Sequence, residues 1–194
     1  PLQGQTDPAV LDDYPWPQLD WFDFSEMDAQ LDAYQDYAIM TAPGSASPGT
    51  LATIQWLLGM EGALSEMLLH PEFYQALIDH IVKFDLAFLR RIADVAGERI
   101  DFYRVGDDFG TQQSLLVSPQ VYRRFFQPFM KAVGELARQH GGYYYHHTCG
   151  AIRRLIPAFI ETGIDVLDPL QVGAAGMVPA ELKAEFGDRI CFSG

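Results

Sequence analysis

Hydrophobic positions along the chain follow two patterns, one with helical spacing and one of short apolar runs. Helical spacing is clearest over 71–97, where Phe73, Leu77 and Ile81 begin a series of apolar residues three or four positions apart. Pro71 suits a first helical turn, which has no hydrogen bond to lose, and Gly97 suits a helix end. The same spacing predicts further helices over 56–70, 119–140, 151–163 and 179–187.

The short apolar runs predict five β-strands, over 36–42, 100–108, 142–148, 164–171 and 189–194. These strands alternate with the predicted helices along the chain. Strands separated by helices pair in parallel through right-handed crossovers, so the fold class is α/β with a parallel sheet. The run at 36–42 reads as a buried strand.

The turns after the predicted strands distinguish between two kinds of α/β fold. None of them has the glycine-rich sequence with which a doubly wound fold binds phosphate. Instead, polar side chains follow the second, third and fourth strands, and in a barrel of parallel strands such ends converge on one mouth. We therefore predict a (β/α)8 TIM barrel. With about five strands, this chain would form an incomplete portion of it.

The predicted barrel begins after an irregular N-terminal segment. Residues 1–36 are rich in proline, aspartate and aromatic side chains and show neither a helical nor an alternating period. We expect this segment to pack Trp16 and Trp21 onto the partial barrel, which would occupy 37–194.

Charge and cysteine content exclude several classes of function. The chain has 13 Lys and Arg against 26 Asp and Glu, a net charge of −13, which repels nucleic acid and anionic membranes. Two cysteines, Cys149 and Cys191, cannot form a disulfide framework, and no leader-like segment opens the chain, so a cytoplasmic setting is favoured. The uncharged stretch 37–60 is interrupted by proline and glycine, which argues against a membrane span.

The sequence YYYHHTCG places an imidazole and a thiol at the end of the third predicted strand. If this segment is extended, His147 and Cys149 leave one face, and His146 and Thr148 leave the other. An imidazole and a thiolate make half of a tetrahedral zinc site. Buried cysteine and hydrogen-bonded histidine are nevertheless common core residues, and the pair lacks further ligands in its sequence neighbourhood.

Other polar residues follow the predicted strands and are candidates for catalysis or binding. Asp107 or Asp108 could supply a metal ligand, a general base or an orienting charge, although adjacent residues on a strand point in opposite directions and either could instead cap a turn. Gln112, Gln171 and His146 are candidates for substrate binding. Asp168, which precedes Pro169, reads as a turn former rather than a catalytic residue.

Four blocks of the sequence together resemble the uroporphyrinogen decarboxylase superfamily, which also contains zinc-dependent methyltransferases that move methyl groups between corrinoids and thiols. The resemblance implies a (β/α)8 barrel and covers nearly all of the chain from about Tyr14. The blocks are GMEGALSEMLLHPEFYQALIDHI, GDDFGTQQSLLVSPQVYRRFFQPFMK, HHTCGAIRRLIPAFIETGIDVLDPLQ and LKAEFGDRICFSG.

Within this superfamily, the methyltransferase-like branch is similar to this sequence at His147 and Cys149, which the resemblance implies to be zinc ligands. A third ligand, a cysteine, is expected beyond Gly194, and Cys191 falls too early to match it. The resemblance thus implies zinc-assisted methyl transfer from a methylated corrinoid, free or on a corrinoid protein, to a small-molecule thiol. Two alternatives stay open, namely cofactor-free decarboxylation of acetate side chains on a tetrapyrrole and an inactive barrel fragment that acts as a binding module. Exposed strand edges would favour a homo-oligomer.

Overall fold

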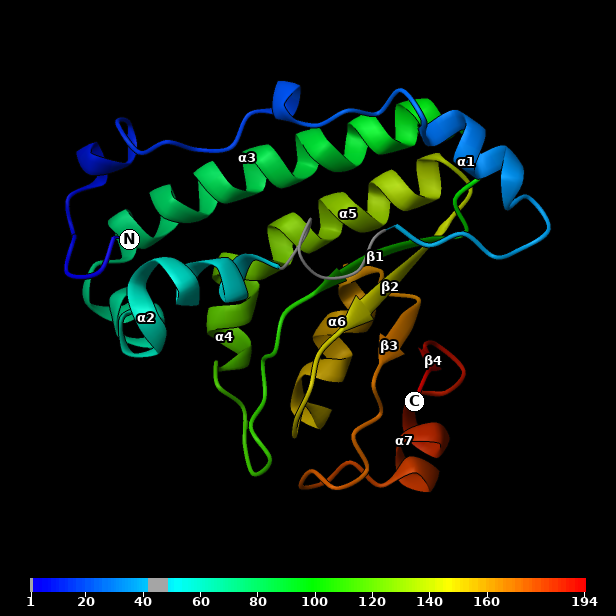
Figure 1. The fold of residues 1–194 in the computed structure, drawn as a ribbon. Coiled ribbons are helices and arrows are strands. Elements are labelled where there is room, and N and C mark those ends of the chain that lie inside the picture. The colour runs from blue at the N-terminus through cyan, green and yellow to red at the C-terminus, as the bar shows by residue number, and fades with distance from the viewer. Residues whose placement is uncertain (1, 42–48) are drawn as a thin grey trace.

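A computed structural model describes residues 2–41 and 49–194 of the protein and contains one parallel sheet of four strands (Figure 1). The strands lie in chain order, and each is parallel to the next. Their bounds are β1 Phe102–Gly106, β2 Tyr143–His147, β3 Val166–Asp168 and β4 Cys191–Phe192. Each falls within one of the predicted strands.

The unbroken strand order distinguishes the sheet from a doubly wound one. A doubly wound sheet reverses its strand order at a switch point. Here each strand lies beside the next one in the chain, and right-handed crossovers between such neighbours place every connecting helix on the same face of the sheet. Alternate strand residues are accordingly buried, including Tyr103, Tyr144 and Leu167. The sheet is thus built as a portion of a barrel wall, as predicted.

Long helices pack beside this sheet, with α3 and α5 running next to each other along its length (Figure 1). Helix α3 begins at Pro71 and ends before Gly97, as predicted. Ser118 caps the next helical stretch, since its Oγ accepts a hydrogen bond from the Val121 backbone N–H at 3.2 Å. The helix bounds are α1 Met27–Ala33, α2 Thr50–Leu69, α3 Pro71–Ala96, α4 Pro119–Val121, α5 Gln127–Gln139, α6 Ile156–Thr162 and α7 Pro179–Phe186, with a π-helical turn over Tyr122–Phe126 between α4 and α5.

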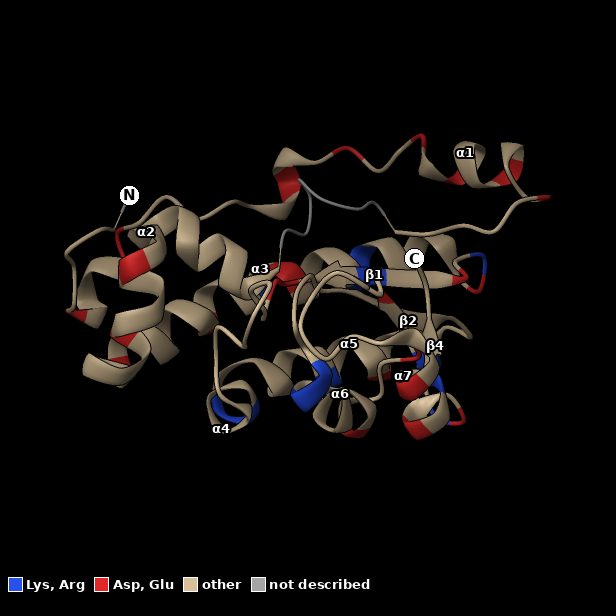
Figure 2. Cartoon of the chain, turned by 90° about the horizontal axis from the view of Figure 1, so that it is seen from below, with Lys and Arg blue, Asp and Glu red and all other residues tan. Residues whose placement is uncertain are grey.

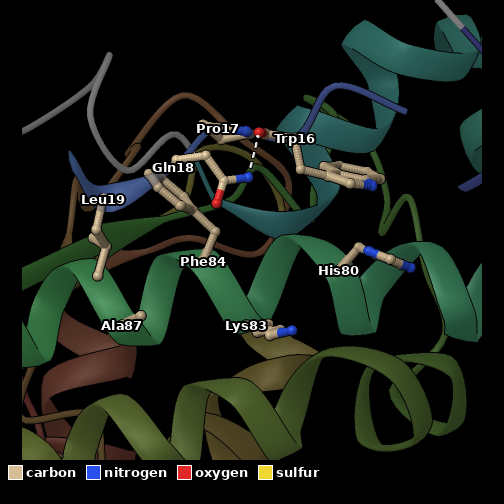
Figure 3. A pocket seen from close by; sticks show the side chains of 8 residues that line it. All are labelled: Trp16, Pro17, Gln18, Leu19, His80, Lys83, Phe84 and Ala87. Carbon is tan, nitrogen blue, oxygen red and sulfur yellow. Dashed lines mark hydrogen bonds between the residues drawn. The ribbon is translucent and has the colours of Figure 1, made fainter. Parts of the chain in front are cut away.

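The N-terminal segment is more ordered than the sequence predicts, because it contains two 3-10 turns and the short helix α1. Trp16 packs onto α3 by stacking on His80, with ring centroids 5.0 Å apart (Figure 3). Trp21 does not pack as expected, since 66% of it is exposed. Between this segment and α3 lies an open cavity of about 400 Å³, which Gln18 and Lys83 also line.

The predicted first strand is wrong in its described part. Within 36–41, only Met40 forms a β-bridge, to Phe102 of β1, and Met40 and Tyr37 are exposed. This segment has the sheet on one side only. It is held by the single bridge and by backbone hydrogen bonds from the Asp101 and Phe102 N–H groups to the Ile39 carbonyl and from the Thr41 N–H to the Phe102 carbonyl. The last residue of the predicted strand, at 42, and the interruption of the uncharged stretch at 43–48 lie outside the described residues.

Charge and hydropathy complete the description of the fold. Acidic positions are spread over α1, α2 and α7 and do not form a single face (Figure 2). No helix in the described part of the chain combines the length and the apolar character that crossing a membrane requires.

Candidate metal centre

The register of the parallel strands brings three polar chain segments together. Gly106 at the end of β1 lies opposite His147 at the end of β2, and His147 lies opposite Asp168 at the end of β3. Asp108 and Cys149 each follow one of these strands by two residues. Because the strands are parallel and aligned, all of these side chains lie at the carboxyl edge of the sheet, where active sites of parallel barrels form.

Asp108, His147 and Cys149 each offer one ligand atom to a common point. These three atoms all lie within 4.8 Å of one another. His147 Nε2 is 3.7 Å from Cys149 Sγ and 3.7 Å from Asp108 Oδ1. In a tetrahedral zinc site the ligand atoms are about 3.4–3.6 Å apart, given the usual Zn–N, Zn–O and Zn–S bond lengths. The three residues therefore fit a metal ion with small adjustments of their side chains.

Backbone hydrogen bonds hold the loop that carries Cys149. The Cys149 N–H donates to Asp108 Oδ1 at 2.8 Å, and the Gly150 N–H donates to Gln171 Oε1 at 2.6 Å. Gly150 has a φ of +95°, and a Cβ there would lie 2.4 Å from the carbonyl carbon of Gly110. Only glycine fits this close approach, which places the thiol beside the imidazole.

The surroundings of Cys149 favour its neutral thiol. Burial raises the pKa of the thiol, and the nearby carboxylates of Asp108 and Asp168 raise that pKa further. A thiol in this setting keeps its proton unless a cation is bound beside it. The same carboxylates that oppose a thiolate would attract a divalent cation.

Asp168 belongs to this cluster, although the sequence favoured a turn-forming role for it. Its Oδ2 lies 3.1 Å from His147 Nδ1 and 3.9 Å from the Arg104 guanidinium. Burial alone would raise the pKa of Asp168, but hydrogen bonds from His147 and Tyr145 and the charges of His147 and Arg104 hold that pKa below its usual value. The sequence patterns above did not predict Arg104 at the site, although a charged residue in the middle of a short apolar strand is a signal for such a role.

His146 does not lie at this site, so its predicted role in substrate binding has no support. The side chain is fully buried on the helix-facing side of the sheet, between Phe109 and Phe159, and its Nδ1 is 3.3 Å from the Tyr144 hydroxyl. Burial lowers the pKa of His146 to about 3, so the ring is neutral. Strand alternation explains the difference from His147, because neighbouring residues point to opposite faces.

Asp107 likewise faces away from Asp108, and a catalytic role for it at this edge has no support. Its side chain is buried, and its Oδ1 accepts a hydrogen bond from the Ala52 backbone N–H at 2.9 Å. Helix α2 lacks a capping side chain of its own, so Asp107 caps it from the end of β1. Burial raises the pKa of Asp107 to about 7, although hydrogen bonds from the first turn of α2 oppose that shift.

The two glutamines differ in their relation to the centre. Gln171 supports the Cys149 loop through the hydrogen bond to Gly150, so the structure assigns its side chain a place at the site. Gln112 is exposed on the loop after β1, and its backbone carbonyl accepts a hydrogen bond from Ala175. A substrate-binding role for either side chain stays a prediction.

Comparison with known proteins identifies the family of the chain. Residues 38–194 match the family model described as uroporphyrinogen decarboxylase (URO-D). Among solved structures, the chain is similar to a methyltransferase from Methanosarcina mazei, with a TM-score of 0.51 and 15% sequence identity. That match covers 74% of this chain and 42% of the methyltransferase chain, and at this identity it shows the fold alone. No curated protein matches the chain.

Proposed function

The chain belongs to the uroporphyrinogen decarboxylase family, and from this premise we propose that it takes part in zinc-assisted transfer of a methyl group from a methylated corrinoid to a small thiol. One observation carries the proposal, namely the convergence of Asp108, His147 and Cys149 at the carboxyl edge of the sheet. Nitrogen and sulfur donors in one site favour zinc over magnesium or calcium, which prefer oxygen ligands alone.

The three residues would hold the metal, each with a different donor atom. His147 would bind through Nε2, Cys149 through its thiolate and Asp108 through Oδ1. A zinc ion bound there with one open position would lower the pKa of an incoming substrate thiol and stabilise its thiolate. About a third of the His147 side chain and half of that of Asp108 are exposed, so a small thiol can approach these groups from solvent.

The transfer itself needs a nucleophilic sulfur and a methyl donor in line with it. The substrate sulfur forms a bond to the methyl carbon, the carbon–cobalt bond breaks with its electron pair left on cobalt, and the thiol proton passes to solvent. The chain spans 42% of the length of the similar methyltransferase.

Zinc content and methyl transfer together test this proposal. We expect the purified protein to bind about one zinc ion per chain. The zinc-loaded protein should convert a small thiol to its methyl thioether with methylcobalamin as donor, detected by mass spectrometry. His147→Ala and Cys149→Ala should lose zinc and turnover. His70→Ala, which removes an exposed histidine of α2's C-terminal end, should retain both.

Two results would direct attention to the alternatives. Absence of zinc after supplementation, together with loss of carboxyl groups from added uroporphyrinogen, would favour tetrapyrrole decarboxylation. Absence of both reactions in a folded chain would favour a binding module. Zinc binding without methyl transfer would contradict the proposed reaction but not the metal site.

A further inference from the structure

Among the described residues, the His147 ring makes one short polar contact, and that contact lies on the nitrogen away from Cys149. Nδ1 lies 3.1 Å from Asp168 Oδ2, whereas the nearest acidic oxygen to Nε2 is 3.7 Å away, on Asp108. A neutral imidazole carries one N–H and one lone pair, and the stronger hydrogen-bond acceptor determines which nitrogen keeps the proton. The geometry thus favours N–H at Nδ1 and a lone pair at Nε2.

Asp168 is itself fixed by its place in the sheet. It is the register partner of His147, and its backbone carbonyl accepts a hydrogen bond from the Thr148 N–H at 2.7 Å. Arg104 lies 3.9 Å from the same carboxylate oxygen that faces His147. Contacts from the end of β2 and from Arg104 on β1 therefore hold the Asp168 carboxylate beside Nδ1.

The close approach of β1 to the His147 ring also favours the position in which Nδ1 faces Asp168. Gly106, the register partner of His147 on β1, lies so close that a Cβ there would be 2.7 Å from His147 Cβ and 3.4 Å from its Cδ2. The absence of a side chain at 106 leaves room for the ring between β1 and Asp168. Sterics and hydrogen bonding thus select the same ring position.

We propose that Asp168 is a positioning residue, which holds His147 as the Nδ1–H tautomer so that the Nε2 lone pair faces Asp108 and Cys149. The expected effect on metal affinity rests on the proposed function, whereas the tautomer of His147 does not depend on a bound metal. Carboxylates that accept a hydrogen bond from a ligating histidine typically contribute 10–100-fold to metal affinity. Asp168 would act through His147 without touching the metal.

Zinc affinity of Asp168 variants gives the first test, by competition with a chromophoric chelator. We expect Asp168→Ala to weaken zinc binding by about 10–100-fold. Asp168→Asn should weaken it less, because the amide oxygen can still accept a hydrogen bond from Nδ1–H. Asp188→Ala serves as the control, since it also removes one negative charge but from a side chain that is 81% exposed and pairs with the neighbouring Arg189.

The second test measures the tautomer directly, by nitrogen NMR of the metal-free protein labelled at histidine. His147 should be the Nδ1–H tautomer in the wild type and in Asp168→Asn, and it should shift toward Nε2–H in Asp168→Ala. A loss of zinc affinity that arose from unfolding alone would lower the melting temperature but would leave the tautomer of the folded fraction unchanged.

The outcomes separate this inference from the proposed function. If the wild type binds zinc and Asp168→Ala binds it equally well, the positioning role is wrong and the metal site stands. If the wild type binds no zinc but Asp168→Ala still changes the tautomer, the positioning role stands and the proposed function fails. An Nε2–H tautomer in the wild type would overturn the inference whatever the zinc affinity.

Discussion

At the scale of single residues, two pairs of adjacent side chains, one of histidines and one of aspartates, each place one member on either face of the sheet. His147 and Asp108 point to the edge where the ligand atoms gather, while His146 and Asp107 point into the layer between sheet and helices. Residue type alone could not separate the members of each pair. Their position in the strand does, because side chains alternate between faces.

The histidine pair yields a prediction that separates folding from metal binding. His146→Ala removes a fully buried ring and should lower the free energy of unfolding by roughly 2–4 kcal/mol, as other large-to-small core substitutions do, without loss of zinc. His147→Ala should abolish zinc binding but change the stability of the metal-free protein by less than about 1 kcal/mol. Urea unfolding and elemental analysis of both variants measure the two effects. Equal losses of stability would contradict the assignment.

Two buried carboxylates make stability depend on pH in an unusual direction. Burial raises the pKa of Asp85 to about 7, and it also raises that of Asp107 to about 7, where Asp85 contributes as well. Between the unfolded value of 3.8 and about 7 the folded state binds more protons than the unfolded state, so each group reduces stability as the pH rises through this range.

Asp85→Asn tests that dependence, since the Oδ2 atom of Asp85 is buried without a hydrogen-bond partner among the described residues. We expect the variant to gain stability relative to the wild type as the pH rises from 5.5 to 8, by roughly 1–2 kcal/mol. Asp79→Asn, on the exposed side of α3, should show no such pH-dependent gain. Urea unfolding at both pH values gives the comparison, and parallel curves for wild type and Asp85→Asn would refute it.

At the scale of elements, pattern and chemistry predicted most of the fold. The periodicity located α3 and the four strands of the sheet, because long amphipathic helices and apolar runs bounded by glycine and polar residues have few alternative structures. The segment at 36–41 was predicted as a strand from its apolar content, but an edge position leaves it with one bridge. Helix α1 was missed because its seven residues are too short for a clear period.

The candidate site was predictable only in part for a related reason. His147 and Cys149 share a strand end, so sequence spacing alone relates them. Asp168 comes from another strand, and its contact with His147 depends on register, which local sequence does not specify. The resemblance to a family supplied the expectation of zinc, and the sequence offered Asp107 or Asp108 as a possible metal ligand, but the choice of Asp108 over Asp107 required the structure.

The junction between α2 and β1 gives a prediction for an element. Gly49 precedes α2 with a φ of +94°, and a Cβ there would lie 1.8 Å from the Gly106 carbonyl oxygen. Gly49→Ala should therefore be more destabilising than Gly97→Ala, which has a positive φ but no atom within 4 Å of an added Cβ. We expect a difference of at least about 1 kcal/mol in urea unfolding. Equal effects would mean that this close approach is absent.

At the scale of the whole molecule, a metal ion would join segments that follow β1 and β2. Asp108 precedes His147 by 39 positions and Cys149 by 41, so the full site can form only when the sheet is folded, and zinc should stabilise the native state. At a free zinc concentration 100 times the dissociation constant, the gain should be about 2.7 kcal/mol. Unfolding with zinc and with chelator measures it, and Cys149→Ala should show little gain. A similar gain in that variant would place zinc elsewhere.

The central claim is that an imidazole, a thiolate and a carboxylate from two strand ends bind one metal ion. X-ray absorption at the zinc edge tests it most directly. We predict one sulfur atom at about 2.3 Å and nitrogen or oxygen atoms at about 2.0–2.2 Å from zinc, with the sulfur signal lost in Cys149→Ser. A first shell without sulfur in the wild-type protein would contradict the account.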